Sequence, residues 1–141
     1  PRNKQLNLKR ESRIITFSLF VAFALLVSCN NNDDSPTTAI NGTWNLKNVR
    51  GGFQPVNIDY TSGEVIWTFK GTGSLIIVNN TAEDAHSGLS SGIYTYKIET
   101  VNNKQRLYVD DSEQGVLLFE DNALIIDEGF AADGYMSEFT R

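Results

Sequence analysis

The chain contains few of the residues that usually carry catalysis or bind metal ions. Its 141 residues include one cysteine, Cys29, and one histidine, His86, so neither a disulfide nor a cluster of thiolate ligands can form within the chain. Carboxylates gather at residues 110–113, 120–121 and 127–128, but none of these groups has the spacing of an EF-hand calcium loop. They indicate solvated turns, with adventitious calcium binding as the alternative.

Motifs of other catalytic classes give little support for an enzyme. The sequence has no glycine-rich phosphate loop and no zinc-ligand spacing. Residues 88–92 have the Gly-x-Ser-x-Gly spacing, but the chain offers one distant histidine as the sole classical base, so a turn explains them better. The pair Ser90-Ser91 lies within residues 88–92, whose glycines are typical of a turn. We therefore expect neither an enzyme nor a bound cofactor or metal, and we assign no catalytic residue, although pairs of carboxylates need no motif.

The N-terminal residues have the composition of a targeting segment. Basic side chains between Lys4 and Arg13 precede an apolar run over residues 14–27, which is shorter than the roughly 20 residues that a membrane-spanning helix needs. A basic start followed by a short apolar run is typical of a secretory signal peptide. We predict that residues 1–28 are a cleaved signal peptide.

The apolar run ends in Leu26-Val27-Ser28-Cys29, which resembles the lipobox of bacterial lipoproteins. In that family the cysteine sulfur receives a diacylglyceryl group, the signal peptidase cuts just before the cysteine, and the new amino terminus is usually acylated. The resemblance implies acyl chains such as palmitate on Cys29, and attachment of the protein to a membrane through them. The alternative is an ordinary secretory signal followed by an incidental cysteine.

Cleavage before Cys29 would leave a strongly acidic chain. Five of the twelve basic residues and one of the seventeen acidic residues precede that position, so the remaining net charge is −9. An acidic surface repels nucleic acid and anionic lipid head groups. We therefore expect no nucleic-acid partner, and membrane attachment would depend on the acyl chains.

A polar segment separates Cys29 from the first apolar pattern of the domain. Its Asn, Asp, Ser and Pro residues favour open, solvated chain, and we assign residues 29–41 as the lipidated cysteine and a flexible tether. Residues 30–34 resemble the tethers of Bacteroidota lipoproteins, in which an acidic patch at this position can act as a surface-export signal. The resemblance implies the outer membrane of the cell envelope, facing either the periplasm or the cell surface. A plain polar spacer is the alternative.

Residues 42–141 are predicted to form one all-β domain. Short runs rich in Val, Ile, Tyr, Phe and Trp recur between Gly, Asn and Asp, and no segment keeps a helical apolar period for three turns. Strands are predicted at 43–50, 64–70, 74–79, 92–100, 105–110, 115–120, 123–128 and 134–141. Eight antiparallel strands are enough to close a barrel and remove its exposed edges. We predict an up-and-down barrel, with a β-sandwich as the alternative.

The lengths of the connections also alternate along the chain. Longer connections, such as 51–63 and 80–91, follow the odd strands, and tight turns follow the even ones. In an up-and-down meander, all odd connections lie at one end of the barrel and all even connections at the other. The sequence therefore predicts one end ringed by longer loops and one end closed by hairpin turns.

The segment Gly42-Thr43-Trp44 resembles the Gly-x-Trp signature of lipocalins and related calycins. In that family the Trp closes the floor of the barrel, and an Arg near the end of the last strand stacks across it. The resemblance assigns this role to Trp44 and Arg141. A cation–π contact of this kind is worth roughly 0.5–2 kcal/mol.

Side chains that alternate toward the barrel interior are the candidate ligand-binding residues. They are Trp67, Phe69, Leu75, Ile77, Tyr94, Tyr96, Leu107, Tyr135 and Phe139. If the barrel is hollow, these residues would hold a small hydrophobic or amphipathic ligand near the loop-ringed end, gated by residues 51–63. If they fill the interior, they are plain core, and the domain is a solid barrel that serves as a protein-interaction or scaffold module of the cell envelope.

Overall fold

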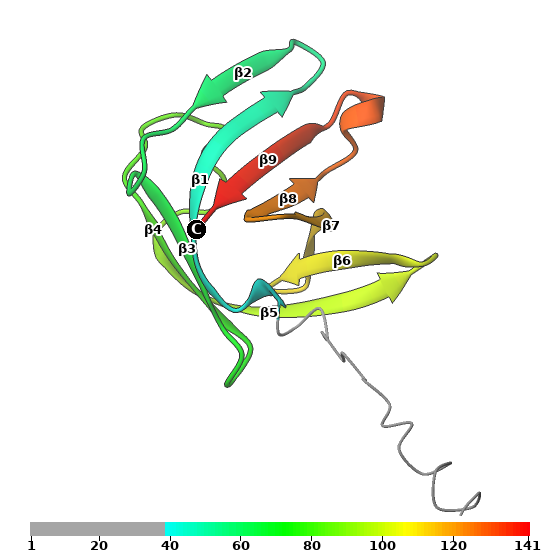
Figure 1. The fold of residues 1–141 in the computed structure, drawn as a ribbon. Coiled ribbons are helices and arrows are strands. Elements are labelled where there is room, and N and C mark those ends of the chain that lie inside the picture. Colours follow the sequence, from blue (N-terminus) through cyan, green and yellow to red (C-terminus); the bar gives the residue numbers. More distant parts are fainter. Residues whose placement is uncertain (1–38) are drawn as a thin grey trace, which may run out of the picture. The chain divides into compact units, whose positions relative to one another are not determined.

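The structure is a computed structural model that describes residues 39–141 of the chain. Nine β-strands dominate this part of the chain (Figure 1). The predicted signal peptide, the lipidation site Cys29 and the tether up to residue 38 lie outside the described residues. The strands are β1 (Gly42–Gly51), β2 (Val56–Asp59), β3 (Val65–Lys70), β4 (Leu75–Asn80), β5 (Gly92–Val101), β6 (Lys104–Val109), β7 (Ser112–Glu120), β8 (Ala123–Asp127) and β9 (Tyr135–Thr140). A short 3₁₀ helix, η1 (Phe130–Ala132), precedes β9. In this part of the chain no helix has the length and hydropathy needed to span a membrane.

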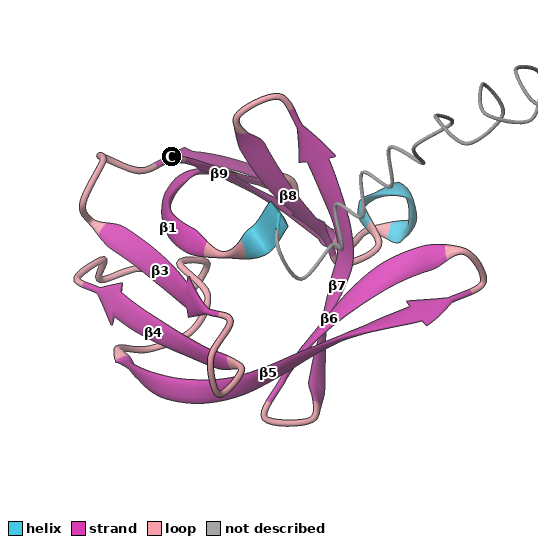
Figure 2. Ribbon diagram, turned by 60° about the horizontal axis from the view of Figure 1, so that its bottom comes forward, coloured by secondary structure: helices cyan, strands magenta, loops and turns pink. Residues whose placement is uncertain are grey.

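The strands form a single antiparallel sheet that closes on itself. After β1 the sheet continues through β3, β4, β5, β6, β7, β8 and β9 in order, and β9 pairs back onto β1. The eight strands of this ring form a closed barrel, and β2 is an extra strand paired with the second half of β1 (Figures 1 and 2). The predicted eight-stranded antiparallel barrel is confirmed, and the sandwich alternative is wrong.

The strand β2 lies inside the segment 51–63, which was predicted to be a gating loop. Its residues Val56 and Ile58 lie opposite Gly51 and Val49 of β1. The run of four residues follows Pro55 and alternates with Asn and Asp, so it carries little strand signal in the sequence. The expected loop is therefore a hairpin that continues the sheet.

The two ends of the barrel differ in the way that the connection lengths predict. Because neighbouring strands run antiparallel, the start of β1 lies at the same end as the tight turns 71–74, 102–103 and 121–122. The longer connections 81–91 and 128–134 lie at the opposite end, together with the two-residue turn 110–111, where a longer connection over 111–114 was expected but β7 already begins at Ser112. We refer to these as the closed end and the loop end.

Large aromatic side chains fill the barrel interior. The ring centroids of Trp67 and Phe139 lie 5.1 Å apart, and those of Phe69 and Tyr96 lie 5.3 Å apart. The first pair is tilted and the second is edge-to-face, arrangements that aromatic pairs prefer over a flat stack. Aliphatic side chains from all around the ring complete this buried cluster, among them Leu46, Val65, Ile76, Val78, Leu107, Leu117, Leu124 and Ile126. The interior is a packed core.

The face of strand β4 that points into the barrel is not the face predicted from the sequence. Leu75 and Ile77 were expected to line the interior, but Ile77 is 41% exposed, whereas Ile76 and Val78 are buried. The pairing with β3 sets this face, because Val78 lies directly opposite the inward-facing Trp67. Residues 75–78 of β4 are all apolar, so alternation alone does not choose between the faces.

Trp44 and Arg141 meet at the closed end. The guanidinium carbon of Arg141 lies 4.4 Å from the centre of the Trp44 ring, as the resemblance to lipocalins led us to expect. The Trp44 indole N–H donates to the carbonyl oxygen of Ile40 at 2.7 Å. The Arg141 guanidinium donates to the carbonyl oxygens of Ala39 and Asn41 at 2.8 and 3.2 Å. These contacts tie the chain before β1 to the end of β9.

Removal of the Arg141 guanidinium should weaken the closed end. Arg141→Ala loses the cation–π contact and both hydrogen bonds, so we expect the free energy of unfolding to fall by about 1–3 kcal/mol in chemical denaturation. Arg50→Ala is the matched control, because the Arg50 guanidinium lies over a ring, Phe130, that is 42% exposed. The control should cost less than about 1 kcal/mol. Equal losses in the two variants would contradict the closing role of Arg141.

Candidate functional site

The connection from β4 to β5, residues 81–91, forms a structured cap over the loop end of the barrel. The Asn80 side chain donates to the carbonyl oxygens of Ser87 and Leu89 at 3.3 and 2.9 Å, and to the Ser87 hydroxyl at 3.0 Å. The oxygen of the Asn80 side-chain carboxamide accepts a hydrogen bond from the backbone N–H of Ala82 at 3.0 Å. Because Asn80 bonds to three points of the cap, the connection has a defined conformation.

Asp84 holds the middle of the cap. One carboxylate oxygen accepts hydrogen bonds from the Tyr60 hydroxyl and from the backbone N–H of His86, each at 2.8 Å. Burial and the contact with Asp84 raise the pKa of Tyr60 well above its ordinary value, so the phenol stays protonated and keeps donating. The Ser87 hydroxyl donates to the Asp84 carbonyl oxygen at 3.0 Å. Together these bonds fix where His86 lies at the barrel mouth.

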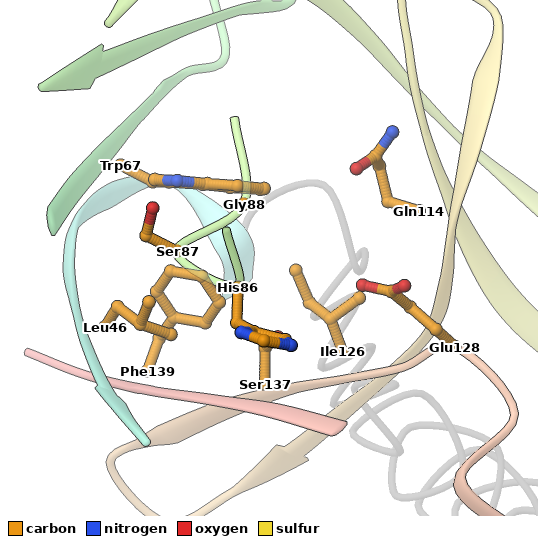
Figure 3. A pocket seen from close by; sticks show the side chains of 10 residues that line it. All are labelled: Leu46, Trp67, His86, Ser87, Gly88, Gln114, Ile126, Glu128, Ser137 and Phe139. Atoms are coloured by element: carbon orange, nitrogen blue, oxygen red, sulfur yellow. The ribbon is translucent and has the colours of Figure 1, made fainter. Parts of the chain in front are cut away.

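Three neighbouring hollows lie beneath and beside the cap. The inner hollow has a volume of about 30 Å³ and reaches the rings of Trp67 and Phe139 (Figure 3). The rim hollow, of about 230 Å³, lies against Val49 and Tyr135. The outer groove, of about 470 Å³, is lined by residues of β6, β7, β8 and η1. The space at the loop end is therefore mostly at the rim and outside the barrel.

Several residues are shared between these hollows and define what we call the rim site, the inner and rim hollows together. Glu128 lines all three hollows, and His86, Gly88 and Ser137 line both the inner and the rim hollow. In Figure 3 the Glu128 carboxylate and the Gln114 carboxamide approach from one side, and His86 approaches with the cap from the other. Polar groups thus converge above an apolar floor.

The pairing of β7 with β8 ends at Val116 and Asp127, so Gln114 and Glu128 lie just beyond the ladder, at the site. The two strands pair from Val116 opposite Asp127 toward the closed end, and the register between β6 and β7 shifts beside Gln114. Gly115 occupies this point with φ +135°, and a Cβ there would lie 2.6 Å from the Asp127 carbonyl oxygen. Only glycine fits this close approach to β8, and the β-bulge between β6 and β7 lies at the neighbouring Gln114.

Glu128 supplies the negative charge of the rim site. Although the residue as a whole is exposed at the rim, burial of its carboxyl group raises its pKa above the ordinary value of 4.5. The neighbouring Asp127 carboxylate is occupied, because it accepts the backbone N–H groups of Gly129 and Phe130 at 2.8 and 2.7 Å. Within residues 39–141 the Glu128 carboxylate has no such partner, and burial is the sole cause of its raised pKa.

Part of the predicted ligand-binding set lies at this site. Trp67 and Phe139 line the inner hollow, and Tyr135 lines the rim hollow. Three further predicted residues, Phe69, Tyr96 and Leu107, are buried and line none of the three hollows. They belong to the packed core.

The remaining predicted residues are directed elsewhere. Tyr94 is half-buried, and its hydroxyl donates to the carbonyl oxygen of Ser90 at 2.9 Å. Leu75 and Ile77 lie on the outer face of β4, opposite the core face of that strand. Tyr94 therefore helps to hold the cap, and the β4 pair takes no part in the rim site.

The polar residues of the rim site were not among the ligand-binding residues predicted from the sequence. Glu128 belongs to an acidic pair that indicates a solvated turn, and the bulge at Gln114 has no sequence signature beyond Gly115. Ser137 was detectable, because it alternates with Tyr135 and Phe139 and is therefore a polar residue at an inward position.

A single carboxylate and a single imidazole are too few to form a metal centre at the rim. No group of three or more His, Cys, Asp or Glu residues in the described part of the chain is placed to hold a metal ion. Comparison of the chain with protein-family models, with curated proteins and with solved structures finds no match. The chemistry of the rim site follows from its own side chains, which suit a small ligand with both polar and apolar parts.

Replacement of Glu128 should relieve a cost that the site imposes on folding. Because its pKa is raised, the ionised carboxylate destabilises the folded state; this cost is absent below the ordinary value of 4.5 and complete above the raised pKa. The Tm difference between Glu128→Gln and wild type should therefore shift in favour of the variant as the pH rises from about 3.5 to 7.

The control for this measurement is Glu138→Gln. Glu138 forms an ion pair with Lys47 at 2.7 Å, so its replacement should bring no gain in stability as the pH rises. A Glu128→Gln difference that stays constant with pH would contradict a dehydrated carboxyl group at this position.

Proposed function

We propose that the protein is a lipid-anchored, lipocalin-like binding protein that holds a small amphipathic molecule in the rim site. The observation that carries the proposal is the pairing of a structured cap with a hollow that has an apolar floor and converging polar walls. Small-molecule sites in proteins commonly take this form. The closed barrel supports the lipocalin-like part, because it is the fold that the Gly-x-Trp resemblance implies.

The volumes of the hollows restrict the ligand. The inner hollow, about 30 Å³, offers room on the order of one water molecule. The rim hollow, about 230 Å³, is smaller than the pockets of roughly 300–1,000 Å³ that hold drug-sized ligands, so it suits a molecule of fragment size. A ligand buried along the barrel axis is disfavoured because Trp67 and Phe139 occupy that space. The proposed ligand therefore sits at the rim, with only its apolar part directed inward.

The anchoring part of the proposal depends on the sequence. Leu26-Val27-Ser28-Cys29 would provide the acyl chains, and residues 30–41 would provide the tether. The chain enters the domain at Ile40, whose carbonyl oxygen accepts the Trp44 indole N–H at the closed end. An anchor attached there would leave the rim site at the far end of the barrel from the outer membrane that carries it.

A second candidate function is a protein-interaction or scaffold module of the cell envelope. It is favoured by the packed interior and by large apolar side chains on the surface, with Phe53 85% exposed and Ile93 69% exposed. Exposed aromatic side chains often serve as anchors in protein interfaces. Under this function the barrel is a solid support and the rim hollow binds nothing, so small-molecule binding separates the two candidates.

Filling the rim site should abolish small-molecule binding. Ser137→Phe places a ring where the inner and rim hollows meet, whereas Ser137→Ala leaves that space open. We expect fragments identified by a ligand-observed NMR screen to bind wild type and Ser137→Ala alike, and to bind Ser137→Phe at least about tenfold more weakly. Circular dichroism establishes that both variants are folded. Equal binding to both variants would contradict the rim site, and a screen without binders would favour the interaction module.

Removal of the proposed lipidation site should release the protein from the membrane. Cys29→Ala keeps the signal peptide but lacks the sulfur that would carry diacylglycerol. In a bacterial host, we expect wild type and an Asn31→Ala control to incorporate radioactive palmitate and to fractionate with the outer membrane. Cys29→Ala should lose the label and most of its membrane association. Membrane association of Cys29→Ala at the wild-type level would contradict lipid anchoring.

A further inference from the structure

The carboxylates around the rim site differ in whether the protein itself satisfies them. Asp127 accepts two backbone N–H groups that start η1, and Glu113 forms an ion pair with Arg106. Among residues 39–141 no hydrogen bond or ion pair engages the carboxylate of Glu128, which is also the carboxylate that lines the inner and rim hollows. The site therefore presents an anion whose counter-ion the described part of the chain does not supply.

A partly dehydrated carboxylate gains most from a cation that carries its own hydrogen-bond donors. No Lys or Arg lines the inner or the rim hollow, and Lys104 and Arg106 line the outer groove alone. A ligand in the rim hollow would thus meet Glu128 without competition from a Lys or Arg side chain.

The other walls of the rim site also suit a cation. The Ser137 hydroxyl and the Gln114 carboxamide oxygen can accept N–H donors beside Glu128. The Tyr135 ring borders the rim hollow beside His86, with ring centroids 5.4 Å apart, and the face of a tyrosine ring attracts cations. An ammonium group carries three N–H donors, and the site offers it three acceptors: a carboxylate, a hydroxyl and a carboxamide. This set of acceptors suits an ammonium group better than it suits a metal ion.

We infer that the rim site binds the protonated amino group of a small amphipathic amine, with Glu128 as its counter-ion. The inference rests on the proposed function and specifies its ligand class. The rim hollow, about 230 Å³, limits the apolar part of the amine to a single ring or a short chain. An anionic ligand of the same size would be repelled by Glu128, and a neutral ligand would leave the carboxylate unpaired.

Three aromatic probes of similar size test this inference: benzylamine, benzyl alcohol and benzoate. They are titrated into the full-length protein in nanodiscs of a zwitterionic lipid, and binding is followed by tryptophan fluorescence, because Trp67 lines the inner hollow. We expect benzylamine to bind at least about tenfold more tightly than benzyl alcohol, and benzoate to bind least. Glu128→Gln should remove this preference by weakening benzylamine about tenfold while leaving benzyl alcohol unchanged.

Glu138→Gln is the matched control, because it removes one carboxylate from the outer side of β9, where Glu138 pairs with Lys47. It should keep the preference for the amine. Equal affinity for the three probes, an unchanged preference in Glu128→Gln, or no binding of benzylamine at millimolar concentration would each overturn the inference.

The failure of this inference is distinguishable from the failure of the proposed function. If all three probes bind equally, and Ser137→Phe abolishes the binding of all three, the rim site binds small molecules without selecting a cation. If Ser137→Phe changes nothing, the rim site itself is wrong.

Discussion

The pairing of β1 with β9 is the constraint on which the rest of the structure depends. The ladder runs from Asn45 opposite Thr140 to Gly51 opposite Tyr135, and it converts an open eight-stranded sheet into a ring without edges. At the closed end Arg141 covers the Trp44 ring, and at the loop end Gly51 approaches β9 so closely that a Cβ would lie 2.4 Å from the Gly134 carbonyl oxygen. The closed end of the ladder is thus held by a side-chain contact, and the loop end depends on the absence of a side chain at Gly51.

Closure also decides where a site can form. An eight-stranded barrel is just wide enough for its own side chains to fill, and here Trp67, Phe69, Tyr96 and Phe139 fill it. The closed end is occupied by the Trp44 and Arg141 contact. Usable space remains at the loop end, where β7 and β8 part and the cap leaves hollows beside it. The packing of the barrel, rather than a sequence motif, therefore determines where the proposed binding site lies.

How far the sequence predicts this structure depends on how much signal each residue carries. Alternating runs around Trp67 and Tyr96 identify buried strands, and the connection lengths identify the loop end, because both follow from local geometry. Leu75 and Ile77 could not be placed, because only the pairing of β4 with Trp67 on β3 selects the inner face. The strand β2 and the role of Glu128 depend on contacts between different segments of the chain, so no local sequence pattern predicts them.

The two neighbouring carboxylates at the end of β8 differ in role: one stabilises the fold, and the other is available to a ligand. Asp127 stabilises the start of η1 by accepting two backbone N–H groups. Glu128 contributes no such bond among the described residues, and its burial opposes folding whenever it is ionised. A ligand that neutralises Glu128 would remove that cost, so its binding would also stabilise the fold. Because Asn80 and Asp84 already hold the cap, little ordering of the protein would be needed on binding, and most of the electrostatic gain would remain available as affinity.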